Sequence, residues 1–466
     1  MKKYSGLLIF YFSIIEVLLF ALPQEKQVLT GEVSFSEIGQ QLQVTASDGA
    51  VISYAKGFDI GLGETVQFVQ PSMAAKVLNQ IYSDTPSQID GNIKANGHVY
   101  LVNSAGIIFG ENSVIEVGKL HAIAGSLSTS DFLLGVENYS SLSGSVENLG
   151  SIVAEEVVFA GSSIKNTGTI LAENGIVVLA AGSGVQLFTE NATLSVVLTE
   201  SSGSSYGVLS DIAGQAVLQS GVVEASRAEF YGKTITATGT TVANKLILSD
   251  IDSVSGTQGS LLVSELSIIG SVDFENAPTI DLSSTTHQIG QVSASGNFQS
   301  ISIRSTGPLL IGESLKPVNF SSQFLDLRVA NGELTMNSLP SPLYSSQENS
   351  ILLATDEVLN LSYDLDQLTY SRMLLFGTNL TAANYQNIES KSENLYQLNS
   401  TSLSLDDLSF NFSSASLQKL ITENPSFNGF SLEESSSLGL SSSNSQADSQ
   451  SVDVVPSLSS FSSPSS

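Results

Sequence analysis

Residues 148–154 read NLGSIVA, and residues 166–172 read NTGTILA, so the same phrase returns after 18 residues. Related phrases stand about three periods earlier, at 91–95 (GNIKA), and about three periods later, at 221–225 (GVVEA). A period near 20 residues, made of short apolar-polar alternation and Gly turns, is typical of stacked coils. The repeat therefore predicts a β-solenoid, a fold that offers a long surface more often than an enclosed pocket.

The rest of residues 24–350 agrees with this interpretation. Apolar and polar residues alternate in short runs, as in LDLRV at 325–329, which an Asn-Gly turn follows. Such runs predict half-buried strands, and helical periodicity is almost absent. In stacked coils the repeated Asn148 and Asn166 would lie one above the other. Their side-chain amides are then expected to form an internal ladder.

The composition excludes several classes of protein. Of the 466 residues, 17 are Lys or Arg and 45 are Asp or Glu, giving a formal charge of −28. Nucleic-acid binding needs a basic surface, so no nucleic-acid partner is expected. The chain has no Cys, which rules out disulfides, zinc-thiolate sites and cysteine nucleophiles. The absence of Cys also suits a chain that crosses a narrow pore unfolded, because a disulfide formed beforehand would block its passage.

The two ends of the chain differ from the repeat. Residues 1–21 combine Lys2 and Lys3 with an apolar run, which predicts a secretory signal cleaved after Ala21. Glu16 lies inside that run, so an uncleaved membrane anchor is the alternative. No later segment is apolar enough to span a bilayer.

Beyond residue 350 the repeat fades. Residues 351–430 are predicted to be irregular, with a short helix over 414–422. Residues 431–466 are rich in Ser and predict a disordered tail, because they carry too little apolar surface to offset the entropy of ordering. A spacer, a glycosylated stalk and an unstructured overhang are the alternatives for its role.

A dense run of short motifs lies between these regions, at residues 58–72, 78–81, 86–91 and 95–110. In order and spacing it resembles the N-terminal secretion domain of filamentous haemagglutinin-like proteins, also called the haemagglutination activity domain. These are the exported partners of two-partner secretion systems in Gram-negative bacteria. The resemblance covers residues 22–190, and 191–350 are expected to continue the rungs.

The resemblance implies a right-handed parallel β-helix and an export route. The chain would enter the periplasm by the general secretory route and engage the periplasmic modules of a dedicated outer-membrane transporter. It would then fold outside the cell. The residues expected to carry recognition are Asn79, Asp90, Gly91, Asn96, Gly97, Asn103, Gly106, Phe109 and Gly110. The alternative is that they are corner residues of the β-helix.

Three motifs depart from the family pattern. The family's Asn-Pro-Asn-Gly turn is here the NSAG of residues 103–106, and its Leu-Asn-Arg-Val is the LNQI of residues 78–81. Tyr54 stands near the place of a family Trp. These departures bear on recognition by the transporter and leave the expected fold intact.

No catalytic, metal or cofactor site is expected. The carboxylates of Asp59, Glu64, Asp90 and Glu111 lack a basic partner cluster and are expected to be solvated at the surface. His98, His121 and His287 are far apart and have no metal-ligand spacing.

The sequence therefore predicts a secreted or surface-exposed β-helical protein with an adhesive or interaction role, and not an enzyme. Its expected partners are the transporter and a ligand on a host cell or other surface. A β-helical polysaccharide-active enzyme is one alternative, although the thin spread of Lys and Arg disfavours it. A toxin-delivery or haem-carrier-binding relative is another.

Overall fold

A computed structural model describes residues 21–190, 193–198, 216–313, 318–337, 339–344, 349–361, 372–377, 379–382, 395–398 and 405. Residues 1–20 of the expected signal, the expected helix over 414–422 and the expected tail over 431–466 lie outside these residues.

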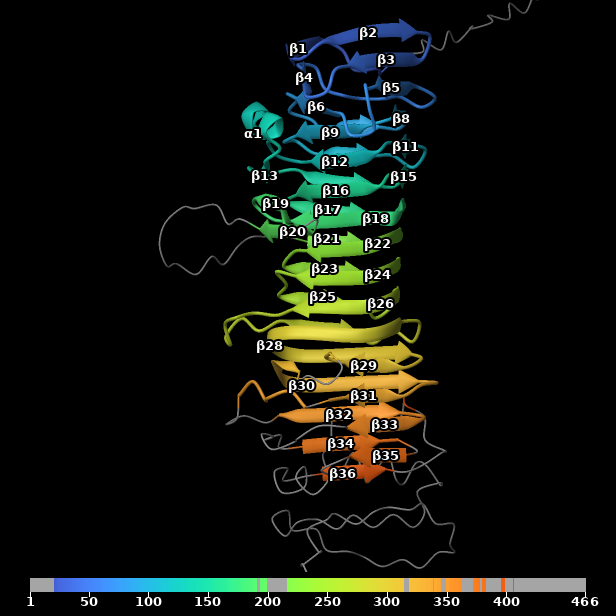
Figure 1. Ribbon diagram of the computed structural model, residues 1–466, viewed down its shortest axis with the longest axis vertical. Helices are drawn as coiled ribbons and strands as arrows, with labels where there is room; N and C mark the ends of the chain where they lie inside the picture. The colour runs from blue at the N-terminus through green and yellow to red at the C-terminus, as the bar shows by residue number, and fades with distance from the viewer. Residues whose placement is uncertain are drawn as a thin grey trace, which may run out of the picture.

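The described strands stack into one long column, from the N-terminal end in blue to the C-terminal end in orange (Figure 1). Each turn of the chain adds a strand to each of three parallel columns, here called A, B and C. Column A stacks β2 (Val33–Ile38), β3 (Gln41–Ala46), β5 (Thr65–Val69), β8 (Asn92–Ala95), β11 (Val114–Glu116) and β15 (Ser151–Val153). Column B stacks β1 (Lys26–Thr30), β4 (Ala50–Tyr54), β6 (Lys76–Ile81), β9 (His98–Asn103), β12 (Lys119–Ile123) and β16 (Glu156–Gly161).

Column C stacks β7 (Ser87–Ile89), β10 (Ile107–Phe109), β14 (Ser145–Asn148), β17 (Ser163–Asn166), β21 (Ala216–Gln219), β23 (Thr234–Ala237), β25 (Ser253–Ser255) and β27 (Thr279–Leu282). Four longer strands then continue columns A and B together: β18 (Thr169–Ala181), β22 (Val222–Tyr231), β24 (Thr240–Ser249) and β26 (Ser260–Ile269). The strand β28 (Gln288–Thr306) pairs with β26 and also with β27 of column C, and β30 (Asn319–Ala330) pairs with the second half of β28. The pairings within the stack are parallel except at the N-terminal end, where β1–β4 and β2–β3 are antiparallel.

The predicted all-β parallel β-helix is thus confirmed. Its core is a set of vertical rows, in which each inward apolar side chain contacts the equivalent one of the next turn. One such row in column C is almost fully shielded from solvent and comprises Ile107, Val146, Ile164, Val217, Ile235, Val254 and Ile280. Burial of these rows supplies the main favourable term for folding.

The stack continues further than the sequence suggested. Strands also lie from residue 350 onward, where an irregular region was expected: β32 (Ser350–Thr355), β33 (Val358–Leu361), β34 (Arg372–Phe376), β35 (Asn379–Ala382) and β36 (Leu395–Leu398). They extend the stack that β29 (Leu309–Ile311) and β31 (Leu334–Met336) precede. Leu359 and Leu375 still occupy buried row positions. The segments between the strands vary in length, which hides the period from a sequence search.

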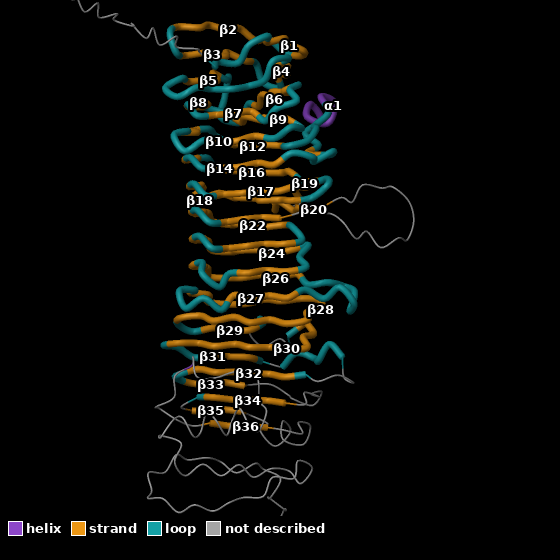
Figure 2. The backbone as a smooth tube through the Cα atoms, turned by 180° about the vertical axis from the view of Figure 1, so that it is seen from behind, coloured by secondary structure: helices purple, strands orange, loops and turns teal. Residues whose placement is uncertain are grey.

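A second small unit packs against the outside of column B (Figure 2). This flank subdomain consists of α1 (Thr129–Leu134) and an antiparallel sheet of β13 (Glu137–Tyr139), β19 (Val185–Glu190) and β20 (Thr193–Leu198). Ser128 caps α1 by accepting a hydrogen bond from the Asp131 amide, and Gly135 ends it with a φ of 71°. The sequence did not predict this subdomain.

The flank subdomain explains why column B strands are buried on both faces. β9 and β12 show consecutive buried residues instead of alternation. Their outer side chains join a second apolar cluster with α1 and β13, which is separate from the core inside the coils. Among the described residues, no helix is long and apolar enough to cross a membrane.

Candidate functional site: corner motifs and the flank network

Asn103, from the altered turn motif, lies fully buried at the end of β9. Its Oδ1 accepts a hydrogen bond from the Ala105 amide at 3.0 Å, and its Nδ2 donates to Ser87 Oγ at 3.1 Å. The Gly106 amide donates to the Asn103 carbonyl and closes the turn, with Gly106 at a φ of 123°. Asn103 and Gly106 alone therefore suffice to make the corner, and Pro is not required at the second position.

Asp90, Gly91 and Gly110 form a second corner, where three chain segments approach closely. A Cβ on Gly91 would lie 2.4 Å from the carbonyl oxygens of Gly61 and Glu64. A Cβ on Gly110 would lie 1.9 Å from Asp90 Oδ1. Only Gly fits either position without moving its neighbours.

Asn96 and Gly97 form a third corner together with Gln70. Asn96 pairs with the backbone of Gln70 in both directions at 2.8 Å, and Gln70 Oε1 accepts from the Gly97 amide at 3.1 Å. The buried Gln70 side chain also donates to the Ala75 carbonyl at 2.7 Å. Gln70 lies in the motif run of residues 58–72, but its role could not be predicted from the sequence, because a single Gln gives no sign of its partners.

Asn79 points into the coil from β6, in the row between Ile52 and Leu101. The Tyr54 hydroxyl donates to Asn79 Oδ1 at 3.1 Å, and Asn79 Nδ2 donates to the Tyr100 carbonyl at 3.0 Å. Burial raises the pKa of Tyr54 far above its ordinary value, so its hydroxyl keeps the proton it donates. Asn79 is thus a satisfied interior amide.

The candidate residues differ sharply in exposure. Asp90 is half-buried and Asn96 is exposed. The other seven are buried: Asn79, Gly91, Gly97, Asn103, Gly106, Phe109 and Gly110. Phe109, for example, stacks on Phe159 with ring centroids 5.8 Å apart. The folded domain hides most of the motif that the sequence singles out.

The two repeated asparagines lie one above the other at the end of column C. Asn148 Nδ2 donates to Asn166 Oδ1 at 2.8 Å, and Asn166 Nδ2 donates to Gln219 Oε1 at 2.6 Å. Gln219 in turn donates to the Thr240 carbonyl at 3.0 Å. The row thus includes Gln219, which the repeated Asn does not predict because this position holds a longer amide than the two asparagines.

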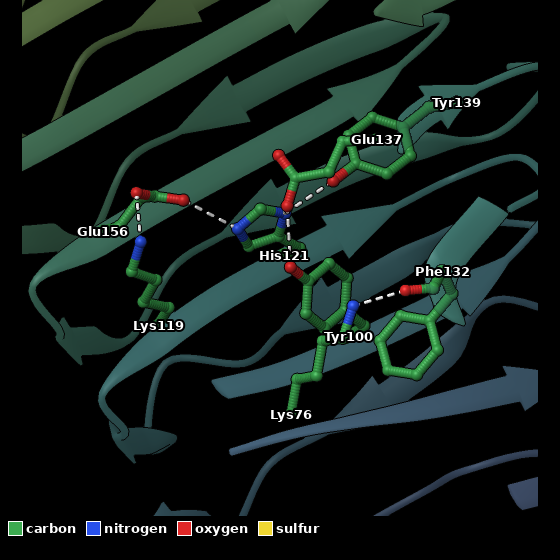
Figure 3. A network of polar contacts seen from close by, with 8 residues as sticks. All are labelled: Lys76, Tyr100, Lys119, His121, Phe132, Glu137, Tyr139 and Glu156. Atoms are coloured by element: carbon green, nitrogen blue, oxygen red, sulfur yellow. Dashed lines mark hydrogen bonds and ion pairs between the residues drawn. The ribbon is translucent and has the colours of Figure 1, made fainter. Parts of the chain in front are cut away.

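A buried polar network joins the flank subdomain to column B (Figure 3). His121 is fully buried, and its Nε2 lies 2.9 Å from Glu156 Oε1 while its Nδ1 lies 2.6 Å from the Tyr139 hydroxyl. Lys119 pairs with the other oxygen of Glu156 at 2.8 Å, and the Tyr100 hydroxyl donates to Glu137 at 2.7 Å. The network therefore links β9, β12 and β16 of the coil to β13 of the flank.

The charges of this network determine which of its groups carry a proton. Burial alone would raise the pKa of Glu156, but His121 and Lys119 outweigh it and lower that pKa to about 2. Burial and Glu137 raise the pKa of Tyr139 well above 10. With Glu156 ionised, Nε2 of His121 carries the proton that faces it. In the neutral imidazole, Nδ1 then accepts from Tyr139.

Other residues that the sequence singled out have structural partners. His287 is buried, accepting from the Leu261 amide at 3.0 Å and donating to the Gly256 carbonyl at 2.9 Å. The expectation of a solvated Glu64 was wrong, since its side chain is 2% exposed. Asp59 accepts from the Gln88 amide at 2.8 Å. In the described part of the chain, no group of three or more His, Cys, Asp and Glu side chains could hold a metal ion.

A parallel coil with a capped N-terminal end and a flank subdomain defines a β-solenoid protein. The model of the TPS secretion domain family matches residues 21–300, more than half of the chain. The chain belongs to this family, whose domain marks two-partner-secreted exoproteins. The expected domain boundary at residue 190 stays a prediction.

Two curated relatives are haem/hemopexin-binding proteins of Haemophilus influenzae. The first is 30% identical over 196 residues, which cover 40% of this chain and 22% of the relative. The second is 35% identical over 102 residues, covering 22% of this chain and 11% of the relative. The chain thus aligns with about a fifth or less of their length. The crystal structure of the HMW1 secretion domain from the same species has a TM-score of 0.42 and 16% identity, and covers 80% of this chain and 99% of that one.

Proposed function

We propose that the N-terminal coils of this protein act as the export signal read by a two-partner outer-membrane transporter. In this proposal the exported rod then serves as an interaction surface outside the cell. Membership of the TPS secretion domain family supports the first part. The second part rests on the rod shape and on the names of the relatives.

The burial of the motif carries a consequence for how export works. A transporter cannot touch Asn79 or Asn103 in the folded domain, because both side chains are fully buried. If the transporter reads them, it reads a chain that has not yet formed its coils. In that case recognition precedes folding, after which Asn103 closes a corner of the rod and Asn79 fills an interior row position.

Folding outside the cell can make export directional. Each completed turn buries a new set of row residues against the previous turn, and stability grows turn by turn in such arrays. The folded turns are too wide to slip back through a pore that passes an extended chain. The absence of Cys means that no disulfide has to be broken beforehand.

The outer surface suits an interaction role better than catalysis. A groove of about 1020 Å³ lies along the corner between columns A and B, and Glu116, Glu155, Glu156, Glu173 and Glu224 line it. A glycoside hydrolase with a carboxylate pair needs one carboxylic acid that holds its proton near neutral pH. The pKa of Glu156 is lowered to about 2, which is the opposite shift. An adhesive role and haem-carrier binding are the two ligand classes to test.

Export from cells that carry a matching transporter tests the proposal. Deletion of residues 58–110 should abolish appearance of the chain in the medium, and unchanged export would contradict the proposal. Asn103→Ala should lower export at least tenfold. Asn174→Ala, at an exposed Asn on β18, is the matched control and should leave it unchanged.

A second control separates recognition from folding. Asn166→Ala damages the interior of the rod outside the motif run. If Asn166→Ala lowers export as much as Asn103→Ala, the motif acts through stability and the recognition role is wrong. If only Asn103→Ala lowers it, recognition is supported.

A further inference from the structure

Glu64 is a buried carboxylate at the N-terminal end of the rod. It follows the turn that starts at Gly61, and its side chain is 2% exposed. The Gly61 amide donates to its Oε2 at 2.7 Å, and the Ala21 amide lies 3.0 and 3.2 Å from its two oxygens. Both oxygens therefore face the place where the described chain enters the fold.

This carboxylate is short of positive charge. Among the described residues, its hydrogen-bond donors are two backbone amides, and no Lys, Arg or His side chain forms an ion pair with it. Burying an ionised carboxylate is costly unless a cation or several hydrogen bonds compensate. Glu37, on β2 at the same end of the rod, is by contrast half-exposed and pairs with Lys26 at 2.6 Å.

The missing cation can come from the chain itself. Leu22 is 4% exposed and packs into the core of the coil, so the segment beside Glu64 is anchored. Cleavage of the expected signal after Ala21 would convert the Leu22 nitrogen into an α-ammonium group. That nitrogen lies one residue beyond the Ala21 amide, within about 7 Å of the carboxylate.

We propose that Glu64 is a binding site for the free α-ammonium group of the processed chain, at Leu22. The ammonium group replaces the Ala21 amide, and the two charges form a shielded ion pair that holds the buried Leu22 in place. This inference rests on the proposed export, because the general secretory route supplies the cleavage. Removal of the signal then completes the N-terminal cap of the rod.

The test uses purified chain that begins at Leu22. The pKa of the Leu22 amine is measured from the pH dependence of its labelling, read by mass spectrometry of the N-terminal peptide. An ordinary α-amine titrates near 7.7–8.0, and the ion pair should raise it to about 9 or above in the folded protein. Urea should return it to the ordinary range, and equal values in both states would overturn the proposal.

Substitutions test whether Glu64 is the group that raises the pKa of the Leu22 amine. Glu64→Gln should abolish the raised amine pKa, whereas Glu37→Gln should keep it. Acetylation of the Leu22 amine should shift the unfolding midpoint of the parent protein but not of Glu64→Gln. A raised amine pKa that survives in Glu64→Gln overturns the proposal. If Glu64→Gln does not fold, the comparison of native and urea-unfolded parent chain still decides. Because all of this is measured on purified chain, failure here leaves the export assay to judge the proposed function separately.

Discussion

Two buried polar networks stabilise this rod, and they are built in opposite ways. Inside the coil, Asn148, Asn166 and Gln219 form a row in which each amide contacts the equivalent residue of the next turn. On the flank, His121 binds Glu156 from a neighbouring strand and Tyr139 from outside the coil. The inner row comes from repetition along one column, whereas the outer network comes from segments that share no repeat.

This difference in construction determines how far the destabilising effect of a substitution extends along the rod. A turn of the coil is held by the turns on both sides, so a defect in the row separates two parts of one continuous core. The flank subdomain packs on the outer side chains of column B through a second apolar cluster, which is separate from the core inside the coils. We therefore expect inner changes to lower the stability of the whole rod, and flank changes to act locally.

The largest difference in free energy of unfolding between a coil variant and a flank variant should come from substituting one glycine in each. A Cβ on Gly168 would lie 2.2 Å from the Gly150 carbonyl oxygen of the adjacent turn, which cannot move without parting the turns. Gly168→Ala should cost about 3 kcal/mol or more in free energy of unfolding. Gly135→Ala, at the end of α1 with no atom within 4 Å, should cost about 1 kcal/mol for its positive φ. Urea denaturation measures both, and equal losses would contradict the distinction between coil and flank.

Asn166→Ala tests the inner row directly. The change removes the shortest hydrogen bond of the Asn148 amide and the Asn166 donor of the Gln219 oxygen, and it opens a cavity in a fully buried row. We expect a loss of about 2–3 kcal/mol in free energy of unfolding. Asn174→Ala, at an exposed position on the next strand, β18, should change it by less than about 0.5 kcal/mol. A similar loss in both variants would mean that the row contributes nothing of its own.

The same contrast explains what the sequence could predict. The stacked coil and the Asn148–Asn166 pair follow from a phrase that returns after 18 residues, because equal spacing places equal residues in one row. His121 gave no such signal, since its partners Glu156 and Tyr139 stand 35 and 18 residues away on unlike elements. Glu64 was misjudged for the same reason, because its burial depends on where Ala21 enters the fold. The burial of Asn79 and Asn103 could not be foreseen from motif order, which does not tell a corner from a contact.

His121→Leu tests whether the flank acts locally. The substitution removes both ring contacts and leaves the buried Tyr139 hydroxyl without its partner. We expect a loss of about 2 kcal/mol, with faster hydrogen exchange in α1 and β13 but unchanged protection in column C. In a double-mutant cycle, His121→Leu and Tyr139→Phe should couple by about 1 kcal/mol. Uniform loss of protection along the rod would show that the flank and the coil unfold together.

Two pH dependences separate the coil from the flank by the pH window in which each acts. Burial lowers the pKa of His287 below 6.5, so the folded coil binds its proton less readily than the unfolded chain does. Stability should therefore be complete above about pH 6.5 and decline below it. The pKa of Glu156 is lowered from 4.5 to about 2, so its contribution holds above about pH 4.5 and is lost as the pH falls toward 2.

One substitution for each residue can show which residue causes the change of stability in each pH range. His287→Gln should flatten the slope of stability against pH just below 6.5, and Glu156→Gln should flatten it only between about 4.5 and 2. Each slope should stay below about 1.4 kcal/mol per pH unit, the limit for one proton. The effect of Glu156→Gln should concentrate in hydrogen exchange of the flank subdomain, and that of His287→Gln in β26 and β28. If both variants change the same pH window, His287 in the coil and Glu156 beside the flank are coupled, and the division between the coil and a separately held flank fails.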